Sequence, residues 1–265
     1  MVDKLQAHLI HANSDMMYAA IVAGNNLGQV WTIDSAESAL YAVWSEYFEG
    51  VHFMGCTGST SKSAFLAFRD NTWLPFLREK GLDCLEFSCD TQEIAVFVLA
   101  AFADHRELKQ YKACVFKLPQ GGSVNAVAPL ASYDITEVDA CFAGQLSKIE
   151  NRDILMKIIT QTCGGMLQFL EHGVGFVALQ NNRICSFALT HFHYLDTCCV
   201  GVETFEPHKR KGLSSQLSSL LCARIAQRGG RIWWDCHVDN IASVKTAQKI
   251  GLVVSHDYDI YWFDI

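Results

Sequence analysis

The sequence contains no hydrophobic run long enough to cross a membrane. Its longest apolar stretch, IAVFVLAAFA, begins at Ile94 and has about ten residues, whereas a membrane-spanning helix needs about 20. The first residues, MVDKLQAHLIHANSD, also lack the positive segment followed by an apolar run that marks a secretory signal. We therefore predict a soluble, cytoplasmic protein that does not bind membranes.

Positive charge is scarce as well. The formal net charge is −7, so the sequence predicts no broad positive surface for duplex nucleic acid, and any bound anion must be held by a local group of residues. Half of the residues are hydrophobic and 18% are charged, which is an ordinary globular composition and not a disordered one.

The cysteines lack the paired spacing of a zinc site. There are 11, an odd number, and they are scattered through apolar runs such as DTCCVGV. Neither Cys84 and Cys89 nor Cys198 and Cys199 form a Cys-x-x-Cys pair. We therefore expect buried free thiols in a reducing compartment and assign no metal.

No repeat and no low-complexity linker is visible in the 265 residues, so we expect an α/β protein of two packed domains, 1–130 and 131–265. The first half alternates predicted strands with predicted helices. Its strands are expected at 28–34, 38–45 and 113–118, its helices at 61–81 and 91–105 with Thr91 as a cap, and its turns at 23–28 and 55–61.

The second half begins with a helix-rich segment that runs to about Cys163. Three predicted strands come next, and they form an antiparallel meander because the first connection is too short for a crossover. The strands are expected at 174–180, 184–195 and 197–204. A helix is then expected at 212–230, with Leu213, Leu217, Leu220, Leu221 and Ile225 on one face and Gly229 as its stop, and after it come a strand at 231–238, a helix at 240–251 and a strand at 256–265.

The stretch ETFEPHKRKGLSSQLSSLL has the features of a phosphate site. A helix that starts at a glycine presents unpaired backbone N–H groups and the positive end of its dipole. Gly212 allows close backbone approach, and Ser214 and Ser215 are small. Lys209, Arg210 and Lys211 add positive charge. The alternative is a solvated basic turn that only precedes a helix.

The meander, this turn and the segment RIWWDCHVDNIASVKTAQKIGL together resemble the GNAT superfamily of acyl-CoA-dependent N-acetyltransferases. The pyrophosphate motif of that family reads Gln/Arg-x-x-Gly-x-Gly/Ala, and KRKGLS is similar to it, with Lys209 at the first position, Gly212 at the glycine and Ser214 at the last. The resemblance implies acetyl-CoA as co-substrate. It also implies that a bulge separates the strand TCCVGVET from its neighbour. The open edge of this strand, Val202 and Thr204 included, then binds the pantetheine arm, and the backbone N–H groups around Gly201–Thr204 also polarise the acetyl carbonyl. Residues 209–215, Leu213 among them, hold the pyrophosphate.

A second motif, DNIASVKTAQKIGL, resembles the Asn-x-x-Ser helix of these enzymes, which implies that Asn240 and Ser243 lie beside the CoA arm. The alternative is a plain helix capped by Asp239 or Asn240. The N-terminal segment HANSDMMYAAIVAGNNLGQVWTIDSAESALYAVWSEYFEGVHFMG resembles a bacterial subgroup with an extra N-terminal α/β domain, so the likeness extends over nearly the whole chain.

Acyl transfer to an amine needs a base and, for the leaving thiolate, an acid. We consider Glu203, Asp196 and His193 as bases, together with His191, because His191 and His193 alternate along one strand and are expected to face the same side. The family resemblance implies a tyrosine acid on the last helix, where this sequence has Ala247. Tyr258 or Tyr261 is therefore the candidate acid.

We expect an acetyl-CoA-dependent N-acetyltransferase that acts on the primary amine of a small molecule. Two alternatives remain open at this point: a non-catalytic acyl-CoA-binding sensor, and an acetyltransferase for a protein or an aminoacyl-tRNA. The acidic balance weighs against the RNA version. The sequence does not specify the acceptor or the oligomeric state.

Overall fold

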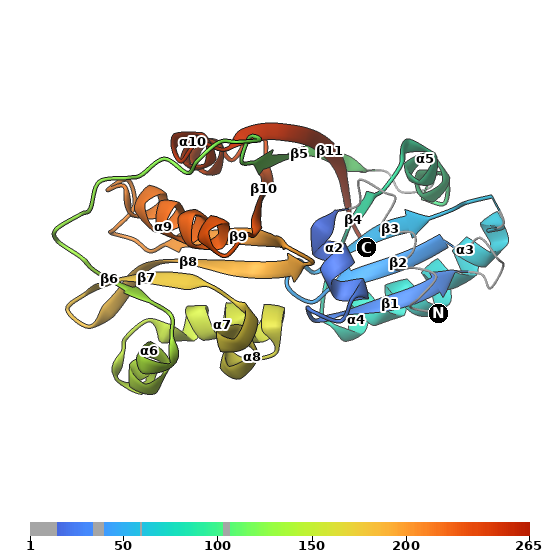
Figure 1. The fold of residues 1–265 in the computed structure, drawn as a ribbon. Helices are drawn as coiled ribbons and strands as arrows, with labels where there is room; N and C mark the ends of the chain where they lie inside the picture. Colours follow the sequence, from blue (N-terminus) through green and yellow to red (C-terminus); the bar gives the residue numbers. More distant parts are fainter. Residues whose placement is uncertain (1–14, 34–39, 59, 103–106) are drawn as a thin grey trace. The chain divides into compact units, whose positions relative to one another are not determined.

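The computed structural model describes residues 15–33, 40–58, 60–102 and 107–265. They form an α/β fold with a mixed sheet, as the sequence predicts (Figure 1). The expected end of the helix at 91–105 falls partly outside the described residues. No helix in the described ranges is both long and apolar enough to cross a membrane.

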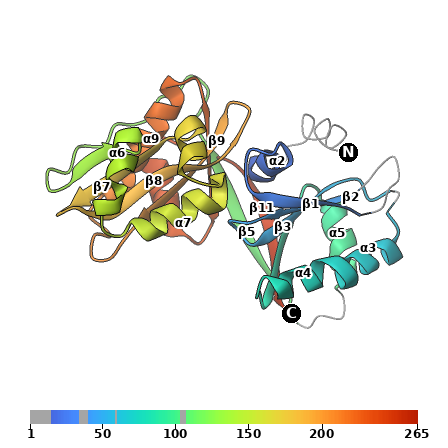
Figure 2. The same ribbon diagram turned by 90° about the horizontal axis from the view of Figure 1, so that it is seen from below.

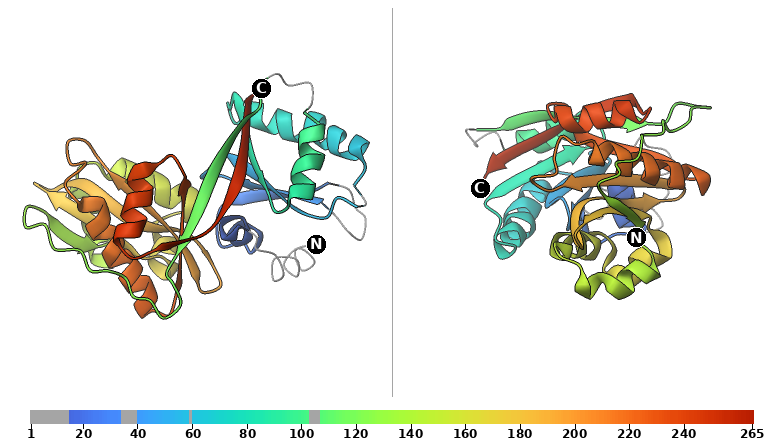
Figure 3. Two further views of the ribbon diagram at one scale, coloured as in Figure 1. Left: turned by 90° about the horizontal axis from the view of Figure 1, so that it is seen from above. Right: turned by 90° about the vertical axis from the view of Figure 1, so that its left-hand side faces the viewer.

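The chain divides into two compact units at other positions than the expected boundary. Unit 1 comprises Met1–Lys112 and Tyr258–Ile265, and unit 2 comprises Ala113–Asp257. The physical reason is strand pairing. Strand β5 (Lys109–Lys117) pairs with a strand of unit 2 from Ala113 onward, and the end of β11 (Val253–Asp264) pairs with a strand of unit 1. β5 and β11 are neighbouring strands (Figure 3).

Unit 1 is built on an antiparallel meander followed by a parallel strand. Its strands are β1 (Gly28–Ile33), β2 (Leu40–Ser45), β3 (Gly50–Gly55) and β4 (Cys84–Cys89), and its helical segments are α2 (Met16–Val22), α3 (Lys62–Phe68), a π-helical turn (Arg69–Trp73), α4 (Leu74–Glu79) and α5 (Gln92–Ala100). Figure 2 shows α2 on the other side of the sheet from α3 and α4. Aromatic side chains fill the core, among them Phe53, Phe65, Trp73 and Phe87.

Unit 2 has helices on both faces of its sheet (Figure 1). Its strands follow the order β5-β10-β9-β8-β7-β6. The strands are β6 (Asp134–Glu137), β7 (Gly175–Gln180), β8 (Arg183–Tyr194), β9 (Thr197–Thr204) and β10 (Arg231–His237), and the helices are α6 (Ala140–Gln145), a 3₁₀ turn (Leu146–Lys148), α7 (Arg152–Cys163), α8 (Met166–His172), α9 (Leu213–Gln227) and α10 (Ile241–Lys249). The predicted meander of β7, β8 and β9 is confirmed.

Helix α9 covers one face of the unit 2 sheet. It is amphipathic because Leu213, Leu217, Leu221 and Ile225 recur at helical spacing, and these side chains pack on Val200 of β9. Leu220 was expected on the same face but is 38% exposed, since it lies off the stripe. The other sheet face packs on α7 and α8 through a separate apolar cluster. All 11 cysteines are free; Cys56 and Cys141 are exposed, contrary to the expected burial.

Candidate functional site

The parallel pairing of β9 with β10 stops midway along both strands. Thr197–Cys199 pair with Arg231–Trp233. Beyond these three positions, and within the described residues, β9 pairs only with β8 and β10 only with β5. We call the gap between Val200–Thr204 and Trp234–His237 the strand opening. It agrees with the separation of strands that the family resemblance implies.

The backbone of β9 presents polar groups to this opening. The Phe205 N–H donates to the Cys185 carbonyl at 2.9 Å, and the register pairs Glu203 with Phe187. Because backbone groups alternate in direction along a strand, the N–H and C=O of Glu203 also point toward β8. Those of Val200, Val202 and Thr204 therefore point into the strand opening, with Val202 and Thr204 being the two expected contacts of the pantetheine arm.

The N-terminus of α9 lies at the end of a loop that comes after β9. Its N-cap is Gly212, whose φ of +93° is a conformation that favours glycine, and no side chain caps the helix. The first intrahelical bond runs from the Gln216 N–H to the Gly212 carbonyl at 3.0 Å. The N–H groups of residues 213–215 are thus left for a ligand or solvent, with the helix dipole behind them. Leu213 takes part through its backbone only, because its side chain is buried.

Three hydroxyl groups connect β8 and β9 to the N-terminus of α9. The Thr204 Oγ1 lies 2.7 Å from the Ser186 Oγ and 2.9 Å from the Ser214 Oγ. Ser186 also donates to the Glu203 carbonyl at 2.7 Å. These hydroxyls hold the start of α9 against the sheet. Thr204 and Ser214 can therefore bind a ligand at the N-terminus of α9 through their backbone N–H groups, but not through free hydroxyls.

The basic residues of the loop are exposed. Lys209, Arg210 and Lys211 reach solvent, and Lys209 forms an ion pair with Glu206 at 3.5 Å. His208 Nδ1 lies 3.0 Å from the Tyr133 hydroxyl. Desolvation, followed by the charges of Lys211 and Arg183, lowers the pKa of His208. The loop therefore holds three positive side chains beside the uncapped end of α9.

Asn240 and Ser243 have structural contacts of their own. The Asn240 Oδ1 accepts from the Ser243 N–H at 3.2 Å and caps α10. The Ser243 Oγ accepts from the Trp234 Nε1 at 2.9 Å. Of the two alternatives given by the sequence, helix capping by Asn240 is thus confirmed, and it leaves the Asn240 Nδ2 as the group that can contact a co-substrate.

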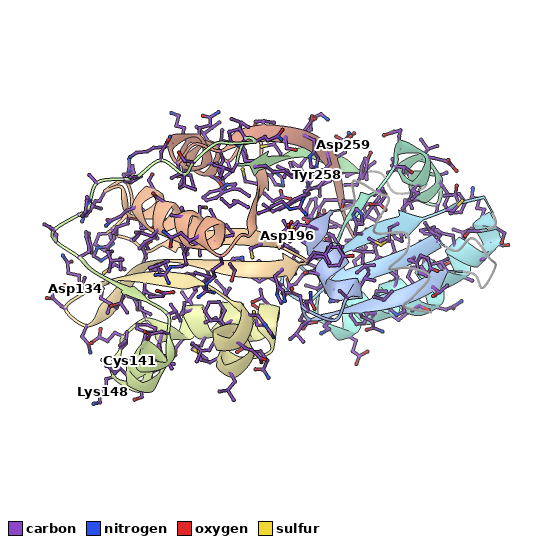
Figure 4. The ribbon with its side chains drawn as sticks, viewed as in Figure 1. Asp134, Cys141, Lys148, Asp196, Tyr258 and Asp259 are labelled. Carbon is purple, nitrogen blue, oxygen red and sulfur yellow. The ribbon has the colours of Figure 1, made fainter. Side chains whose placement is uncertain are left out.

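The bases proposed from sequence fall at two different places. Glu203 is exposed on β9, beside the strand opening. Asp196 lies at the turn that leads into β9 (Figure 4), where the Arg231 guanidinium approaches its Oδ1 to 2.6 Å and lowers the pKa of that carboxyl. His193 pairs in register with Cys198 on the closed side of the opening. Asp196 and His193 line a cavity of about 290 Å³ with Cys198 and Ile225.

His191 and His193 do not face the same side. A bulge on β8, between Thr190 and Phe192, adds His191 to the strand, so the alternation that the sequence suggests is broken there. The His191 ring packs on Gly201, where a Cβ atom would lie 1.8 Å from the His191 Cε1. Burial lowers the pKa of His191 to about 4, so the ring is neutral at pH 7. The bulge that the resemblance implies is therefore on β8, opposite β9.

The candidate acids belong to unit 1, whereas the strand opening lies in unit 2. Tyr261 is buried in the core of unit 1, where its ring stacks on Phe87 at 5.1 Å, and burial raises its pKa. This burial rules out Tyr261 as the acid. Tyr258 lies on β11 (Figure 4). Ala247 is fully buried in the core of unit 2 and supplies no polar group.

The residues of β10 that border the strand opening were not identified from the sequence. Ile232 and Trp234 pack with the apolar residues of α9, so strand alternation places Trp233, Asp235 and His237 on the opposite face. The sequence gives no clean alternation here, because Ile232–Trp234 is an apolar run, and only the end of the β9–β10 pairing at Trp233 shows that Asp235 and His237 border an opening.

Comparison with known proteins places this geometry in a family. Residues 7–261 match the family model described as GNAT acetyltransferase. A curated relative, the uncharacterized N-acetyltransferase YdfB of Bacillus subtilis, is 27% identical over 95 residues, and the match spans 36% of each chain's length.

Solved structures share the fold. A GCN5-related N-acetyltransferase-like protein from Streptococcus suis has a TM-score of 0.69 at 17% identity, with 99% of this chain and all of that chain covered. A tandem GNAT protein from the clavulanic acid biosynthesis pathway has a TM-score of 0.63 at 10% identity and covers 99% of this chain and 93% of its own.

Proposed function

Because the chain belongs to the GNAT acetyltransferase family, a family of acyltransferases, we propose that it transfers the acetyl group of acetyl-CoA to the primary amine of a small molecule. The observation that supports this most strongly is the combination of two features in unit 2. The uncapped N-terminus of α9 offers an anion site, and the strand opening beside it offers unpaired backbone groups.

In this proposal the pyrophosphate binds the N–H groups at the start of α9. Lys209, Arg210 and Lys211 contribute positive charge, and Gly212 leaves room for the phosphate, since a Cβ there would contact only Leu130 at 3.9 Å. The pantetheine arm adds to β9 as a strand would, and accepts and donates hydrogen bonds at Val202 and Thr204. The Asn240 Nδ2 and the Ser243 region border the arm from α10.

The chemistry requires a neutral amine and a polarised thioester carbonyl. Backbone N–H groups that point into the strand opening can polarise the carbonyl. Among the bases proposed from sequence, Glu203 borders the opening, whereas Asp196 and His193 lie beyond the paired segment of β9 and β10. A CoA thiol leaves readily because its pKa is near that of other thiols, about 8.5, so the reaction does not depend on Tyr258 as an acid.

A second candidate function is a cytoplasmic acyl-CoA-binding sensor without catalysis. The buried Ala247 favours it, because the expected tyrosine acid is missing from α10. Both candidates require acetyl-CoA binding and differ only in turnover.

Isothermal titration of the protein with acetyl-CoA tests the shared requirement, and an amine panel read out as free CoA separates the two. The panel contains an aliphatic diamine, an arylalkylamine, an aminoglycoside and an amino acid amide. Binding with release of CoA on one of these amines is the expected result. Binding without release on any of them supports the sensor, and no binding refutes both.

A further inference from the structure

The strand opening fixes how deep an acyl thioester can reach, if the proposed function holds. The arm of CoA from pyrophosphate to sulfur has about 12 chain atoms, as many as the backbone of about four strand residues. The N-terminus of α9, where the pyrophosphate is proposed to bind, is linked to Thr204 by the hydrogen bond between the Ser214 and Thr204 hydroxyls. An arm that runs back along β9 from Thr204 therefore brings its sulfur to the level of Val200, next to the last paired position, Cys199.

The carboxylate closest to that level is Asp235, not Glu203. Cys199 pairs with Trp233, so Gly201 and Asp235 each lie two residues past the closed end of the opening, about 7 Å along their strands. Glu203 lies four residues past it, about 13 Å. Asp235 thus lies about one residue, roughly 3 Å, from the level of the sulfur, whereas Glu203 lies three residues from it and nearer the pyrophosphate.

Gly201, Glu203 and Asp235 share one sheet face. Val200 and Val202 on β9, and Trp234 and Cys236 on β10, pack with the apolar residues of α9. Alternation places the residues between them on the opposite face. The His191 ring packs on Gly201 on this face, so an acceptor that approaches from this face meets the thioester beside that ring and without passing α9.

The Asp235 carboxylate is held in place by its own strand. The Trp233 Nε1 donates to the Asp235 Oδ2 at 3.4 Å. The Trp233 ring in turn is covered by the Lys117 Nζ, 4.6 Å from the ring centroid, and by the His256 ring at 5.5 Å. Asp235 is half-buried, so the partly desolvated carboxylate can bind a cation more strongly than an exposed one can.

We propose that Asp235 is the catalytic residue that binds the ammonium group of the acceptor and takes its proton. The amine nitrogen, once neutral, attacks the thioester carbonyl carbon, so that a C–N bond forms and the C–S bond breaks. The sulfur leaves as a thiolate, and the nitrogen, which carries a positive charge once the C–N bond has formed, loses its second proton through solvent to that thiolate to give the CoA thiol. The first proton, held by Asp235, returns to water. The acceptor is accordingly a cationic amine, with Glu203 at the outer end of the opening as a second anionic contact.

The variant Asp235→Asn tests this assignment, because asparagine keeps an oxygen for the Trp233 N–H but cannot take a proton. The matched control is Asp257→Asn, which removes a neighbouring exposed charge on β11. The other titratable groups around Asp235 are Cys114 and Lys117 on β5, His191 on β8, Glu203 on β9, His237 on β10, and His256 and Asp257 on β11. Acetyl-CoA titration, thermal unfolding and pH–rate profiles are measured for the wild type and both variants with the best amine of the panel.

We expect Asp235→Asn to lower kcat/KM about 10²- to 10⁴-fold, with acetyl-CoA affinity and the unfolding temperature unchanged. Its rate should rise toward the wild-type rate at high pH, where the free amine needs no base, whereas Asp257→Asn keeps the wild-type profile. If Asp235→Asn instead lowers the unfolding temperature and leaves the shape of the pH–rate profile intact, the role of Asp235 is only structural. That result overturns the assignment. An active wild type with an equally active Asp235→Asn variant overturns the assignment alone. A wild type that acetylates no amine refutes the proposed function as well.

Discussion

Substitutions of Gly212 test directly whether a phosphate binds at the N-terminus of α9. Gly212→Trp and Gly212→Ala share the same backbone penalty, because both place a side chain on a residue with φ of +93°. That penalty is about 1–2 kcal/mol in stability. A Cβ atom at this position contacts only Leu130 Cδ1 at 3.9 Å, so alanine fits without steric conflict. The difference between the two variants therefore isolates the bulk of the indole ring in the space that the phosphate needs.

The expected loss is set by the groups that the indole would block. The N–H groups of residues 213–215 have no intrahelical acceptor and no side-chain cap. A hydrogen bond to a charged group contributes about 1.5–3 kcal/mol. Loss of two such bonds amounts to about 3–6 kcal/mol, or roughly 10²- to 10⁴-fold in Kd.

Isothermal titration with acetyl-CoA measures this difference, and circular dichroism checks that both variants fold. We expect Gly212→Ala to bind within a few-fold of the wild type and Gly212→Trp to lose at least roughly 100-fold. Equal affinities for Gly212→Trp and the wild type would refute the phosphate site at α9. An equal, large loss in both variants would mean that backbone strain, and not steric exclusion, governs binding at the N-terminus of α9.

Three further predictions concern other parts of the molecule. Gly201→Ala places a Cβ 1.8 Å from the His191 ring, so we expect it to lower the free energy of unfolding by about 1–3 kcal/mol. A double variant that also carries His191→Ala should recover part of this loss in denaturant titration. Additive effects of the two substitutions would contradict the contact. Burial raises the pKa of Asp15 from 3.8 to about 6. The folded state thus binds the extra proton, and stability falls as pH rises through this range; Asp15→Asn, which keeps an acceptor for the Met17 N–H, should flatten that dependence in thermal melts, and an unchanged slope would refute it. Asn240→Asp keeps the helix cap and removes the amide donor, whereas Asn240→Ala removes both. We expect only the alanine variant to lose about 1 kcal/mol of stability, and both to bind acetyl-CoA more weakly in the titration; full affinity in both would leave Asn240 as a cap alone.

The sequence predicts those elements that have a clear connection or spacing signal. The meander of β7, β8 and β9 follows from its short first connection, although β8 is buried throughout Ile184–Phe192 and does not alternate, and helix α9 follows from its leucine spacing. β3 and α2 were missed. β3 is buried at Gly50–Met54, and every residue of α2 is buried, so neither segment has a polar face that marks its period. Strand β2 is buried at every position too and was predicted, so burial alone does not account for the two misses.

The candidate site also has parts that the sequence predicts and parts that it does not. The proposed phosphate site is local in sequence, since a strand, a basic turn, a glycine and a helix come one after another, so the sequence alone is enough to propose it. The bulge at His191 could not be predicted, because one extra residue on β8 is visible only in the register with β9. The role proposed for Asp235 could not be read from the sequence either, because only the strand pairing shows that β10 leaves β9 after Trp233.

Unit 1 contains the same order of elements and shows why order alone does not create the site. An antiparallel meander leads through a loop and helical segments to β4, which pairs in parallel with β3 over three positions, as β10 does with β9. The helix that comes after β3 is capped by Ser61, whose Oγ accepts the Ala64 N–H at 3.1 Å.

Polar side chains also join the two parallel strands of unit 1. The His52 ring bonds the Ser88 Oγ at 2.7 Å and the Asp90 carboxylate at 2.9 Å. Groups that bind one another in this way have little left for a ligand. In unit 2 the corresponding helix start is a glycine without a side-chain cap, and β9 leaves β10 after Cys199. Among the described residues, the uncapped helix and the strand opening therefore occur together in unit 2, and it is this pair of features, more than the order of elements that both units have, that supports the proposed acyl-CoA binding there.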